Sequence, residues 1–406
     1  MTTKVMKFGG SSLATAERIR SSARIAAEEA RNGTSIAVVV SAMGKTTEGL
    51  LGLAGEVSCA MNRREMDQLL ASGEQQSAAL FSLALQDLGI PARSYTGAQA
   101  GIQAQGMCMD GRISSIDPTG IAEGFKRGEC AIVAGFQGLG AGGEVLTLGR
   151  GGSDLTAVAL AAALNAEDCL IYTDVDGIFS ADPNRVPAAR LIDCLSYEEC
   201  LEMAVLGAKV MQARSVEVAA KYRVPVAVLS SFHPGGGTRV QEQCVREDLV
   251  VRAVVPDRGV AKVAVLGVPD VPGIAARLFV GLAERGITVE MIIQSTMRGQ
   301  VNDIAFLVKK GLLGEAIDAC REVAREIDAQ GVNFDVEVGR VSIVGAGIAN
   351  HVDVPGKMFS VLAREGINLD MIASSSVSIT CVVALDRLDD AARALHRAFI
   401  EEEGQE

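Results

Sequence analysis

Short runs of apolar residues alternate along the chain with longer stretches in which apolar residues recur at helical spacing. Three such apolar runs are Ile36–Val40, Cys130–Ala134 and Cys169–Tyr172. Continuous runs of this length are typical of strands that are buried on both faces of a parallel sheet. Ala14–Ala30 and Glu65–Leu88 have the spacing of helices, the second with an expected break at Ser72–Glu74. Repeated strand–loop–helix units predict an α/β fold, a three-layer αβα sandwich with a mostly parallel sheet.

The same pattern continues to about residue 240 and then changes. Ser196–Tyr222 is predicted to be helical and Pro225–Leu229 to be the last strand. Gly235–Gly237 marks the expected end of this unit, because a run of glycines punctuates structure strongly. We therefore expect a first domain over residues 1–240, followed by domains over 250–335 and 336–402. Segment 248–261 is a candidate partner strand for the last of these.

The C-terminal part contains an internal repeat with a constant offset of 80 residues. Phe279, Leu282, Ala283, Gly286, Ile287, Met291 and Ile292 recur as Phe359, Leu362, Ala363, Gly366, Ile367, Met371 and Ile372. Each copy is predicted to run strand, Pro-Gly loop, helix, glycine and strand. A unit of this size is a small domain rather than a solenoid repeat. A duplicated module of this kind serves either ligand binding or dimerisation alone.

Composition narrows the class of protein. Aromatic residues make up 4% of the 406 residues and there is no Trp, so the cores are built from Ala, Val, Leu and Ile. The net charge of −12 argues against nucleic acid or an anionic membrane surface as a partner. The nine Cys are scattered without a C-x-x-C pair, which predicts reduced thiols and neither a disulfide framework nor a zinc site. No signal peptide or membrane-length apolar run is apparent, so we expect a cytoplasmic protein.

The stretch Gly149–Thr156, which begins G-R-G-G-S-D and consists mostly of glycine and short polar residues, leads directly into the strongly helical run Ala157–Leu164. Ser153 or Asp154 is a natural N-cap, and Gly151 and Gly152 leave the backbone open to close approach. A helix that begins this way presents free N–H groups and a positive dipole end, which suit an anion. The alternative is a glycine loop with an ordinary cap.

Two further motifs accompany it: K-F-G-G-S-S at residues 7–12 and T-D-V-D-G-I-F-S-A-D-P at residues 173–183. In this order the three motifs resemble the amino-acid kinase superfamily and, within it, the aspartate kinases. The C-terminal repeat resembles paired ACT domains, ferredoxin-like βαββαβ modules that bind amino acids. The resemblance covers nearly the whole chain. It implies transfer of the ATP γ-phosphoryl to the β-carboxylate of L-aspartate, the first step of lysine, threonine and methionine biosynthesis.

The resemblance assigns the catalytic work to Lys7, Asp154 and Lys209. The two lysines would flank the transferring phosphoryl group, and Asp154 would hold both of them. A carboxylate substrate is already ionised at pH 7, so no general base is required. Without the resemblance, Lys7 could equally be a surface lysine beside a turn and Lys209 a solvated helix lysine.

The resemblance also assigns the binding residues. For the substrate these are Ser41, Thr47, Glu74, Arg150, Gly151, Gly152 and Ser153, with Glu74 on the α-amino group and Arg150 and Ser153 on carboxylate oxygens. For ATP with Mg²⁺ they are Lys7, Gly9, Gly10, Ser11, Thr173, Asp174, Phe179, Ser180, Asp182, Arg185 and Lys209. Relatives usually have Arg directly after the Asp-Pro pair; this chain has Asn184 there and Arg185 one place later. From sequence alone, Glu74 could instead be an acid that complements a helix dipole.

The paired ACT-like repeats imply feedback by lysine or threonine, with Asp270, Gln294 and Asn368 at the matching effector positions, and a homo-oligomer joined through the repeats. A second departure lies at Ser374–Ser376, where relatives usually have an acidic residue. Two other functions remain open: a glutamate or acetylglutamate kinase that shares the catalytic trio, and a non-catalytic amino-acid sensor. The serine–threonine loop at residues 41–47 and the paired repeats favour aspartate kinase.

Overall fold

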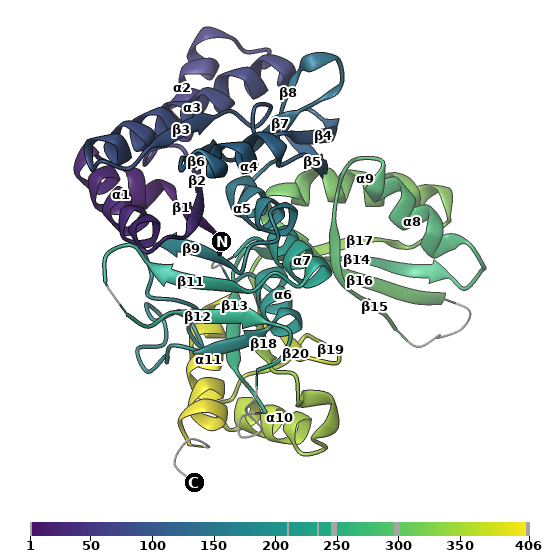
Figure 1. Ribbon diagram of the computed structural model, residues 1–406. Helices are drawn as coiled ribbons and strands as arrows, with labels where there is room; N and C mark the ends of the chain where they lie inside the picture. The colour runs from purple at the N-terminus through teal and green to yellow at the C-terminus, as the bar shows by residue number, and fades with distance from the viewer. Residues whose placement is uncertain (1, 209–210, 234, 245–249, 296–300, 403–406) are drawn as a thin grey trace. The chain divides into compact units, whose positions relative to one another are not determined.

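The computed structural model describes residues 2–208, 211–233, 235–244, 250–295 and 301–402 (Figure 1). The chain divides into two compact units. The first contains the described residues up to Ile178, Leu191–Ala204 and those from 211 to 244. The second contains Phe179–Arg190, Val205–Ala208 and the described residues from 250 onward. Two short segments from the middle of the chain therefore belong to the second unit.

The first unit is built around an eight-stranded sheet in the order β10-β12-β11-β9-β1-β2-β6-β3. All neighbouring strands are parallel except β11 and β12, which are antiparallel. The strands are β1 (Thr3–Phe8), β2 (Ser35–Val40), β3 (Ala92–Tyr95), β6 (Cys130–Ala134), β9 (Asp168–Thr173), β10 (Cys194–Ser196), β11 (Val226–Ser230) and β12 (Thr238–Gln241). The predicted mostly parallel sheet is confirmed.

Helices cover both faces of this sheet, which completes the predicted three layers (Figure 1). Successive side chains of β1 point to opposite faces of the sheet. On one face, Met6 and Phe8 pack against α1 (Ala16–Arg31) and α3 (Arg63–Asp87). On the other, α5 (Gly152–Ala163) contacts β1, β2 and β9 and packs against α7 (Ala213–Tyr222). Phe8 also stacks on Tyr172, with a ring-centroid distance of 4.7 Å, in the hydrophobic core between the sheet and helices α1 and α3. The helices are α1 (Ala16–Arg31), α2 (Thr46–Val57), α3 (Arg63–Asp87), α4 (Thr119–Lys126), α5 (Gly152–Ala163), α6 (Tyr197–Val205) and α7 (Ala213–Tyr222).

A small second sheet, ordered β5-β4-β7-β8, was not expected from the sequence. Its strands are β4 (Ile102–Met107), β5 (Asp110–Ile116), β7 (Gln137–Leu139) and β8 (Val145–Thr147). Strands β7 and β8 have only three residues each, and β5 is largely polar, so the pattern of apolar residues gives little sign of them. The buried carboxylate of Asp67, on α3, holds this sheet by accepting hydrogen bonds from the Met109 N–H at 3.0 Å and the Thr147 hydroxyl at 2.5 Å.

The second unit contains two four-stranded antiparallel sheets, ordered β15-β16-β14-β17 and β13-β18-β20-β19. We call β14–β17 with α8 and α9 the first repeat domain, and β13 and β18–β20 with α10 and α11 the second repeat domain. The elements are β13 (Ala253–Asp257), β14 (Val260–Pro269), α8 (Ile274–Ala283), β15 (Val289–Gln294), β16 (Val301–Lys309), α9 (Leu313–Glu326), β17 (Gly331–Asp335), β18 (Val338–Val344), α10 (Val354–Arg364), β19 (Met371–Ser374), β20 (Ser378–Ala384) and α11 (Leu388–His396). Short helical turns are η1 (Gly10–Leu13), η2 (Ala141–Gly143), η3 (Lys310–Leu312), η4 (Ile348–Asn350), η5 (Leu385–Arg387) and η6 (Arg397–Glu401).

The repeat found in the sequence corresponds to these two domains. Helices α8 and α10 begin at Ile274 and Val354, 80 residues apart, as the offset requires. The first repeat domain has the ferredoxin-like order β14-α8-β15-β16-α9-β17, whereas the second runs β18-α10-β19-β20-α11 and takes its fourth strand from elsewhere in the chain. In the second repeat domain the strand beside β18 is β13, which comes from the segment 248–261 ahead of the first repeat.

Three local expectations were wrong. Helix α3 runs without a break through Ser72–Glu74, and Gly73 lets it approach the loop after β2 closely, since a Cβ there would lie 3.0 Å from the Ala42 Cβ. The span 196–222 forms two helices, α6 and α7. The glycines 235–237 precede β12, so the sheet continues beyond the expected last strand and boundary. In each case tertiary contacts override local propensity.

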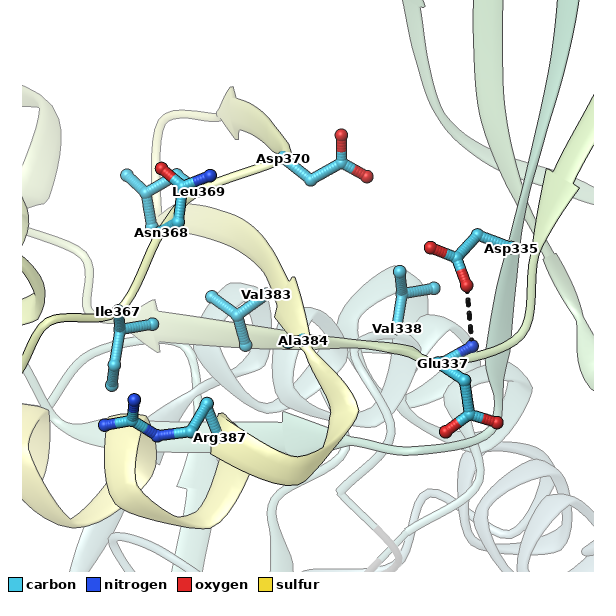
Figure 2. A pocket seen from close by; sticks show the side chains of 10 residues that line it. All are labelled: Asp335, Glu337, Val338, Ile367, Asn368, Leu369, Asp370, Val383, Ala384 and Arg387. Atoms are coloured by element: carbon cyan, nitrogen blue, oxygen red, sulfur yellow. Dashed lines mark hydrogen bonds between the residues drawn. The ribbon is translucent and has the colours of Figure 1, made fainter.

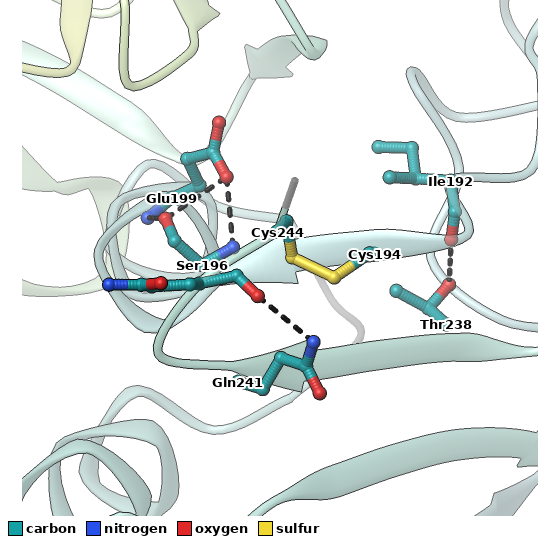
Figure 3. Close-up of a disulfide and its surroundings, with 8 residues drawn as sticks. Ile192, Cys194, Ser196, Glu199, Thr238, Gln241 and Cys244 are labelled. Atoms are coloured by element: carbon teal, nitrogen blue, oxygen red, sulfur yellow. Dashed lines mark hydrogen bonds between the residues drawn. A yellow bond between two sulfur atoms is a disulfide. The ribbon is translucent and has the colours of Figure 1, made fainter. Parts of the chain in front are cut away.

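The expectation that all nine cysteines are reduced was also wrong. Cys194 and Cys244 form a disulfide with a Cα–Cα distance of 5.9 Å (Figure 3). Cys194 begins β10, and Cys244 follows β12, which pairs with β10 in parallel. The bridge joins sites 50 residues apart because the sheet brings them together, and sequence spacing contains no sign of this. The other seven cysteines, all in the described part of the chain, are free.

Removing this bridge should destabilise the first unit. In C194S we expect the free energy of unfolding to fall by about 3–4 kcal/mol, because the disulfide closes a loop of 50 residues in the unfolded chain. Urea denaturation under non-reducing conditions measures the change, with C59S, at an exposed free cysteine, as the control. Dithiothreitol should lower the stability of the wild type and leave that of C194S unchanged. Equal stability of the wild type with and without reductant would contradict the bridge.

No helix among the described residues combines the length and apolar character needed to cross a bilayer.

Candidate active site

The predicted pair of Lys7 and Asp154 is formed. Lys7 is the penultimate residue of β1, and Asp154 lies in the first turn of α5. The Lys7 Nζ is 2.7 Å from the Asp154 Oδ1, and the two side chains are only 11% and 13% exposed. The residues are 147 positions apart in sequence and meet because α5 packs directly on β1. An ion pair this sheltered holds the ammonium in one place at the carboxyl edge of the sheet.

The glycines after Lys7 form a tight turn with an open backbone. The Gly9 N–H donates to the Tyr172 carbonyl, and the Gly10 carbonyl accepts from the Gly44 N–H at 2.9 Å. A Cβ on Gly9 would lie 3.4 Å from the Lys7 Nζ, and one on Gly10 would lie 2.9 Å from the Ala42 carbonyl oxygen. The backbone beside the ammonium is therefore accessible only because both residues lack side chains. Ser11, the next residue, lies in the helical turn η1.

The start of α5 differs from the expected cap. Gly151, with φ of +71°, occupies the N-cap position, and Gly152, Ser153 and Asp154 form the first turn. Gly151 is required there because a Cβ would lie 2.5 Å from the Gln212 Cγ. Ser153 is buried against Gly135 after β6, whereas Arg150 is exposed just before the helix. The N–H groups and the positive dipole end of the helix thus flank the Lys7–Asp154 pair.

Glu74 lies in the middle of α3, not at a helix start, and is 4% exposed. Its Oε1 accepts a hydrogen bond from the Ala42 N–H at 3.2 Å. Its Oε2 is buried without a hydrogen-bond partner in the described structure. Burial raises the pKa of Glu74 from 4.5 to about 7, and the Ala42 N–H opposes this shift. A buried carboxylate oxygen that lacks a donor is suited to a cationic ligand.

The remaining substrate candidates lie around the same loop. The Ser41 N–H donates to the Phe8 carbonyl at 3.1 Å, which ties the end of β2 to the end of β1. Thr47 lies in the first turn of α2 and is partly buried. The loop between these residues contains Ala42, which contacts both Glu74 and Gly10. This backbone link between the acid and the glycine turn has no signature in the sequence.

The predicted nucleotide residues are divided between the two units. Thr173 and Asp174 end β9 in the first unit, whereas Phe179, Ser180, Asp182 and Arg185 belong to the second. The motif at residues 173–183 is continuous in the sequence and contains no sign that its residues belong to two units.

Within the second unit, several of these side chains already have protein partners. The buried Ser180 hydroxyl contacts His396 Nε2 at 2.9 Å. Arg185 pairs with Asp389 at 2.9 Å, and the Asp182 carboxylate accepts from the Asn184 backbone and side chain. The offset Arg185 is thus engaged with the second repeat domain. Lys209, the second predicted cation, lies outside the described residues.

Two of the effector candidates lie at one end of the first repeat domain. Asp270 follows β14 and accepts a hydrogen bond from the Asn302 side chain at 3.2 Å. Gln294, which ends β15, pairs with Ile304, two residues along β16 from Asn302. Asn302 is 5% exposed and its Oδ1 has no partner in the described structure. Sequence reasoning did not single out Asn302, although a polar residue within an apolar strand is a usable signal.

Asn368 lines a cavity of about 280 Å³ that is formed mostly by the second repeat domain, with Asp335 contributed by the end of β17 (Figure 2). Asp335, Glu337 and Asp370 contribute acids to its wall, and Arg387 contributes a guanidinium. The Asp335 carboxylate accepts from the Glu337 N–H at 2.8 Å. The cavity thus presents both signs of charge beside apolar residues, which fits a small zwitterion.

The described residues contain no cluster of three or more His, Cys, Asp or Glu with the geometry of a metal site. Mg²⁺ in phosphoryl-transfer enzymes is held largely by substrate phosphates and water, with one or two carboxylates. The sheltered Asp154 beside the open glycine turn fits that arrangement. The residues present are therefore compatible with a magnesium–nucleotide complex.

Comparison with known proteins agrees with this geometry. Residues 2–230 match the amino acid kinase family, and residues 262–313 and 341–399 each match ACT domains. An aspartokinase from Mycolicibacterium smegmatis is 45% identical over 97% of this chain and 95% of that protein. An aspartokinase from Thermus thermophilus is 43% identical over 97% of this chain and 98% of its own length.

The chain belongs to the aspartokinase family. It is therefore a kinase with two ACT domains, which are the first and second repeat domains. Among solved aspartokinases, Escherichia coli aspartokinase III in complex with aspartate and ADP superimposes with a TM-score of 0.81 at 25% identity, covering 98% of this chain and 99% of that one. The complex of the same enzyme with lysine and aspartate gives a TM-score of 0.75 at 26% identity, with the same coverage.

Proposed function

We propose that this aspartokinase transfers the γ-phosphoryl group of ATP to the β-carboxylate of L-aspartate, giving 4-phospho-L-aspartate and ADP. This is the first step toward lysine, threonine and methionine. The observation that carries the proposal is the Lys7–Asp154 pair, with its 2.7 Å contact, beside the open Gly9–Gly10 turn. The relatives named aspartokinase at 43–45% identity support the choice of aspartate.

The chemistry needs charge balance and alignment more than covalent help from the protein. A β-carboxylate oxygen of aspartate attacks the γ-phosphorus, and the bond from that phosphorus to the β,γ-bridging oxygen breaks. ADP leaves with the bond's electron pair, and an acyl phosphate forms. Lys7 stabilises the negative charge that builds on the phosphoryl oxygens, and Asp154 holds the ammonium in position. The substrate carboxylate is already ionised, so no proton has to be removed.

In this proposal the protein binds aspartate both at its α-ammonium group and at its carboxylate oxygens. The partnerless Oε2 of Glu74 accepts the α-ammonium group, because this buried acid has room for one more donor. Arg150 and Ser153, with the N–H groups of Gly151 and Gly152, bind carboxylate oxygens at the positive end of α5. Ser41 and Thr47 border the same loop.

The nucleotide side of the proposal combines the glycine turn and the end of β9. Backbone N–H groups of Gly9, Gly10 and Ser11 approach phosphate oxygens, while Lys209 supplies the second cation. Thr173 and Asp174, at the end of β9 in the first unit, border the nucleotide. Mg²⁺ bound to the phosphates would add charge neutralisation that lysines alone do not provide.

Hydroxamate formation from aspartate and ATP tests the proposal directly. In the presence of hydroxylamine, the full chain should convert aspartate to the hydroxamate and release ADP in equal amounts. Glutamate and acetylglutamate should give no product at the same concentration. Product with either of these and none with aspartate would replace the substrate assignment. Binding of lysine with no ATP turnover on any acceptor would reduce the chain to a sensor.

We also infer that lysine, threonine or both inhibit the enzyme through the first repeat domain. Asp270, Gln294 and the partnerless Oδ1 of Asn302 offer anionic and amide oxygens to an amino group at one end of this domain. Asn368 borders the cavity formed mostly by the second repeat domain. Assembly of a homo-oligomer through these domains and a cytoplasmic location complete the proposal.

Loss of the Asp270 charge should weaken inhibition selectively. In D270N we expect the half-inhibitory concentration of the active effector to rise by at least about tenfold, because a charge-assisted hydrogen bond becomes a neutral one. The kcat without effector should stay within about twofold of the wild type. Steady-state assays with lysine and threonine, singly and together, measure this, with D318N on the exposed face of α9 as the control. Unchanged sensitivity of D270N would remove this residue from the effector site.

A further inference from the structure

Arg214, in the first turn of α7, joins the two edge strands of the small sheet β5-β4-β7-β8. Its guanidinium donates to the Leu148 carbonyl, directly after β8, at 2.8 Å and to the Gly111 carbonyl on β5 at 2.9 Å. A Cβ on Gly111 would lie 3.0 Å from the Thr147 carbonyl oxygen, so the two edges approach closely. Edge strands present backbone groups that the ladder leaves unpaired, and a guanidinium fork can satisfy two of them at once.

The chain continues from Leu148 into residues 149–153, which we call the carboxylate turn because the proposed function places the carboxylate oxygens of aspartate there. A Cβ on Gly149, which has φ of +75°, would lie 3.5 Å from the Met109 carbonyl oxygen in the β4–β5 connection. A Cβ on Gly152 would lie 2.9 Å from the Leu148 Cβ. The Gly152 N–H donates to the Gly149 carbonyl at 3.0 Å, which closes the turn. The turn is therefore built on the two strands that the guanidinium joins.

A second side chain from the start of α7 packs on the same turn. Gln212 is the N-cap residue of α7, and a Cβ on Gly151 would lie 2.5 Å from the Gln212 Cγ. Helix α5, which begins within the turn, also packs along α7. All these residues belong to the first unit, as do Arg214, Leu148 and Gly111. The start of α7 thus holds the carboxylate turn twice, by hydrogen bonds at its root and by packing at its centre.

We propose that Arg214 is a positioning residue for aspartate binding. By joining Leu148 to β5, it fixes the point from which the carboxylate turn departs, and so the placement of Arg150 and of the N–H groups at the start of α5. The inference rests on the proposed function, in which these groups bind the carboxylate oxygens of the substrate. Arg214 touches no substrate atom in this proposal, because its guanidinium is engaged with the two carbonyls.

The anchoring is tested first without any assay of activity. In R214M, amide hydrogen exchange in a peptide that covers residues 148–153 should accelerate by at least about tenfold, measured by mass spectrometry on the full chain. The control is R239M, which removes the ion pair of Arg239 with Asp168 at the start of β9, the opposite end of that strand from Thr173. Equal exchange of this peptide in R214M and R239M would overturn the proposal, whatever the substrate is.

The positioning role is tested next by kinetics. We expect the KM for aspartate in R214M to rise by about 10–100-fold, because a misplacement of about 1 Å can cost that much. The KM for ATP and kcat should stay within about threefold of the wild type, since Lys7 and Asp154 are placed by the packing of α5 on β1. R214K should fall between R214M and the wild type, because an ammonium replaces only part of the planar fork. A merely structural role would reduce the folded fraction and leave both KM values unchanged, and that result would overturn the positioning role.

Q212A provides a second route if R214M does not fold. It removes the side chain that packs on Gly151, and the Gln212 Oε1 has no partner in the described structure, so its loss leaves no donor without an acceptor. The same selective rise in the KM for aspartate should follow, and equal rises in both KM values would contradict the role. Failure of the wild type to phosphorylate aspartate would instead overturn the proposed function. The exchange experiment, with the Kd for aspartate from isothermal titration calorimetry on the wild type and R214M, would still decide the role of Arg214.

Discussion

Replacing Lys7 by methionine should lower kcat by about a thousandfold while the protein remains folded. The ammonium is 2.7 Å from Asp154 and beside the Gly9–Gly10 turn, so it stabilises charge only where phosphoryl oxygens bind. Removal of one preorganised donor of this kind typically lowers a rate by about 10²–10³-fold. Methionine preserves most of the volume of the side chain. Steady-state hydroxamate assays at saturating aspartate and ATP measure the loss.

Lys4 provides the matched control on the same strand. Lys4 pairs with Glu29 at 2.9 Å, and its side chain lies on the opposite face of β1 from that of Lys7. K4M should keep kcat within about twofold of the wild type. Circular dichroism and thermal unfolding of both variants distinguish lost catalysis from lost folding. A kcat for K7M within tenfold of the wild type would remove Lys7 from the reaction.

The second large effect concerns the pH dependence of aspartate binding. Burial raises the pKa of Glu74 to about 7, so its carboxyl group is neutral below this pH and charged above it. Only the charged form attracts the α-ammonium of the substrate. We therefore expect kcat/KM for aspartate to fall as the pH decreases from 8 to 6, with an apparent pKa near 7. The kcat/KM profile reports the free enzyme, in which Glu74 has no cationic partner.

E74Q should abolish this pH dependence and raise the KM for aspartate at pH 8. The expected rise is about 10–100-fold, which corresponds to the loss of a charge-assisted hydrogen bond worth about 1.5–3 kcal/mol. E65Q, an exposed acid in the first turn of the same helix, is the control and should leave both quantities unchanged. If the profile of E74Q kept the apparent pKa near 7, another group would be responsible.

The same carboxyl group affects stability in the opposite direction. Its pKa is raised on folding from 4.5 to about 7, so the folded protein binds more protons than the unfolded chain in this range. The free energy of unfolding should therefore decrease as the pH rises through this window, by up to about 3 kcal/mol from this group. Urea denaturation of the substrate-free enzyme at pH 5 and pH 8 measures the difference, and E74Q should reduce it.

The sequence by itself determined the features that depend on residues close together in the chain, such as single strands and the repeated domain. The apolar runs at Ile36–Val40 and Cys130–Ala134 indicate strands buried on both faces, because no alternation with polar residues is present. The offset of 80 residues identified two copies of one domain, and α8 and α10 begin at that spacing. Lys7 and Asp154 were paired by resemblance to a family, and the structure places them in contact.

Only the tertiary structure decided which distant groups meet in the interior. The raised pKa of Glu74 arises from its burial against the Ala42 loop, and local sequence contains no measure of burial by other elements. The Cys194–Cys244 bridge and the contact of Arg214 with Leu148 join residues 50 and 66 positions apart. The periodicity of apolar residues specifies which face of a helix or strand is buried, but not which other element packs against that face. The partner is selected by packing and by the need to satisfy each buried polar group, which are properties of the whole fold.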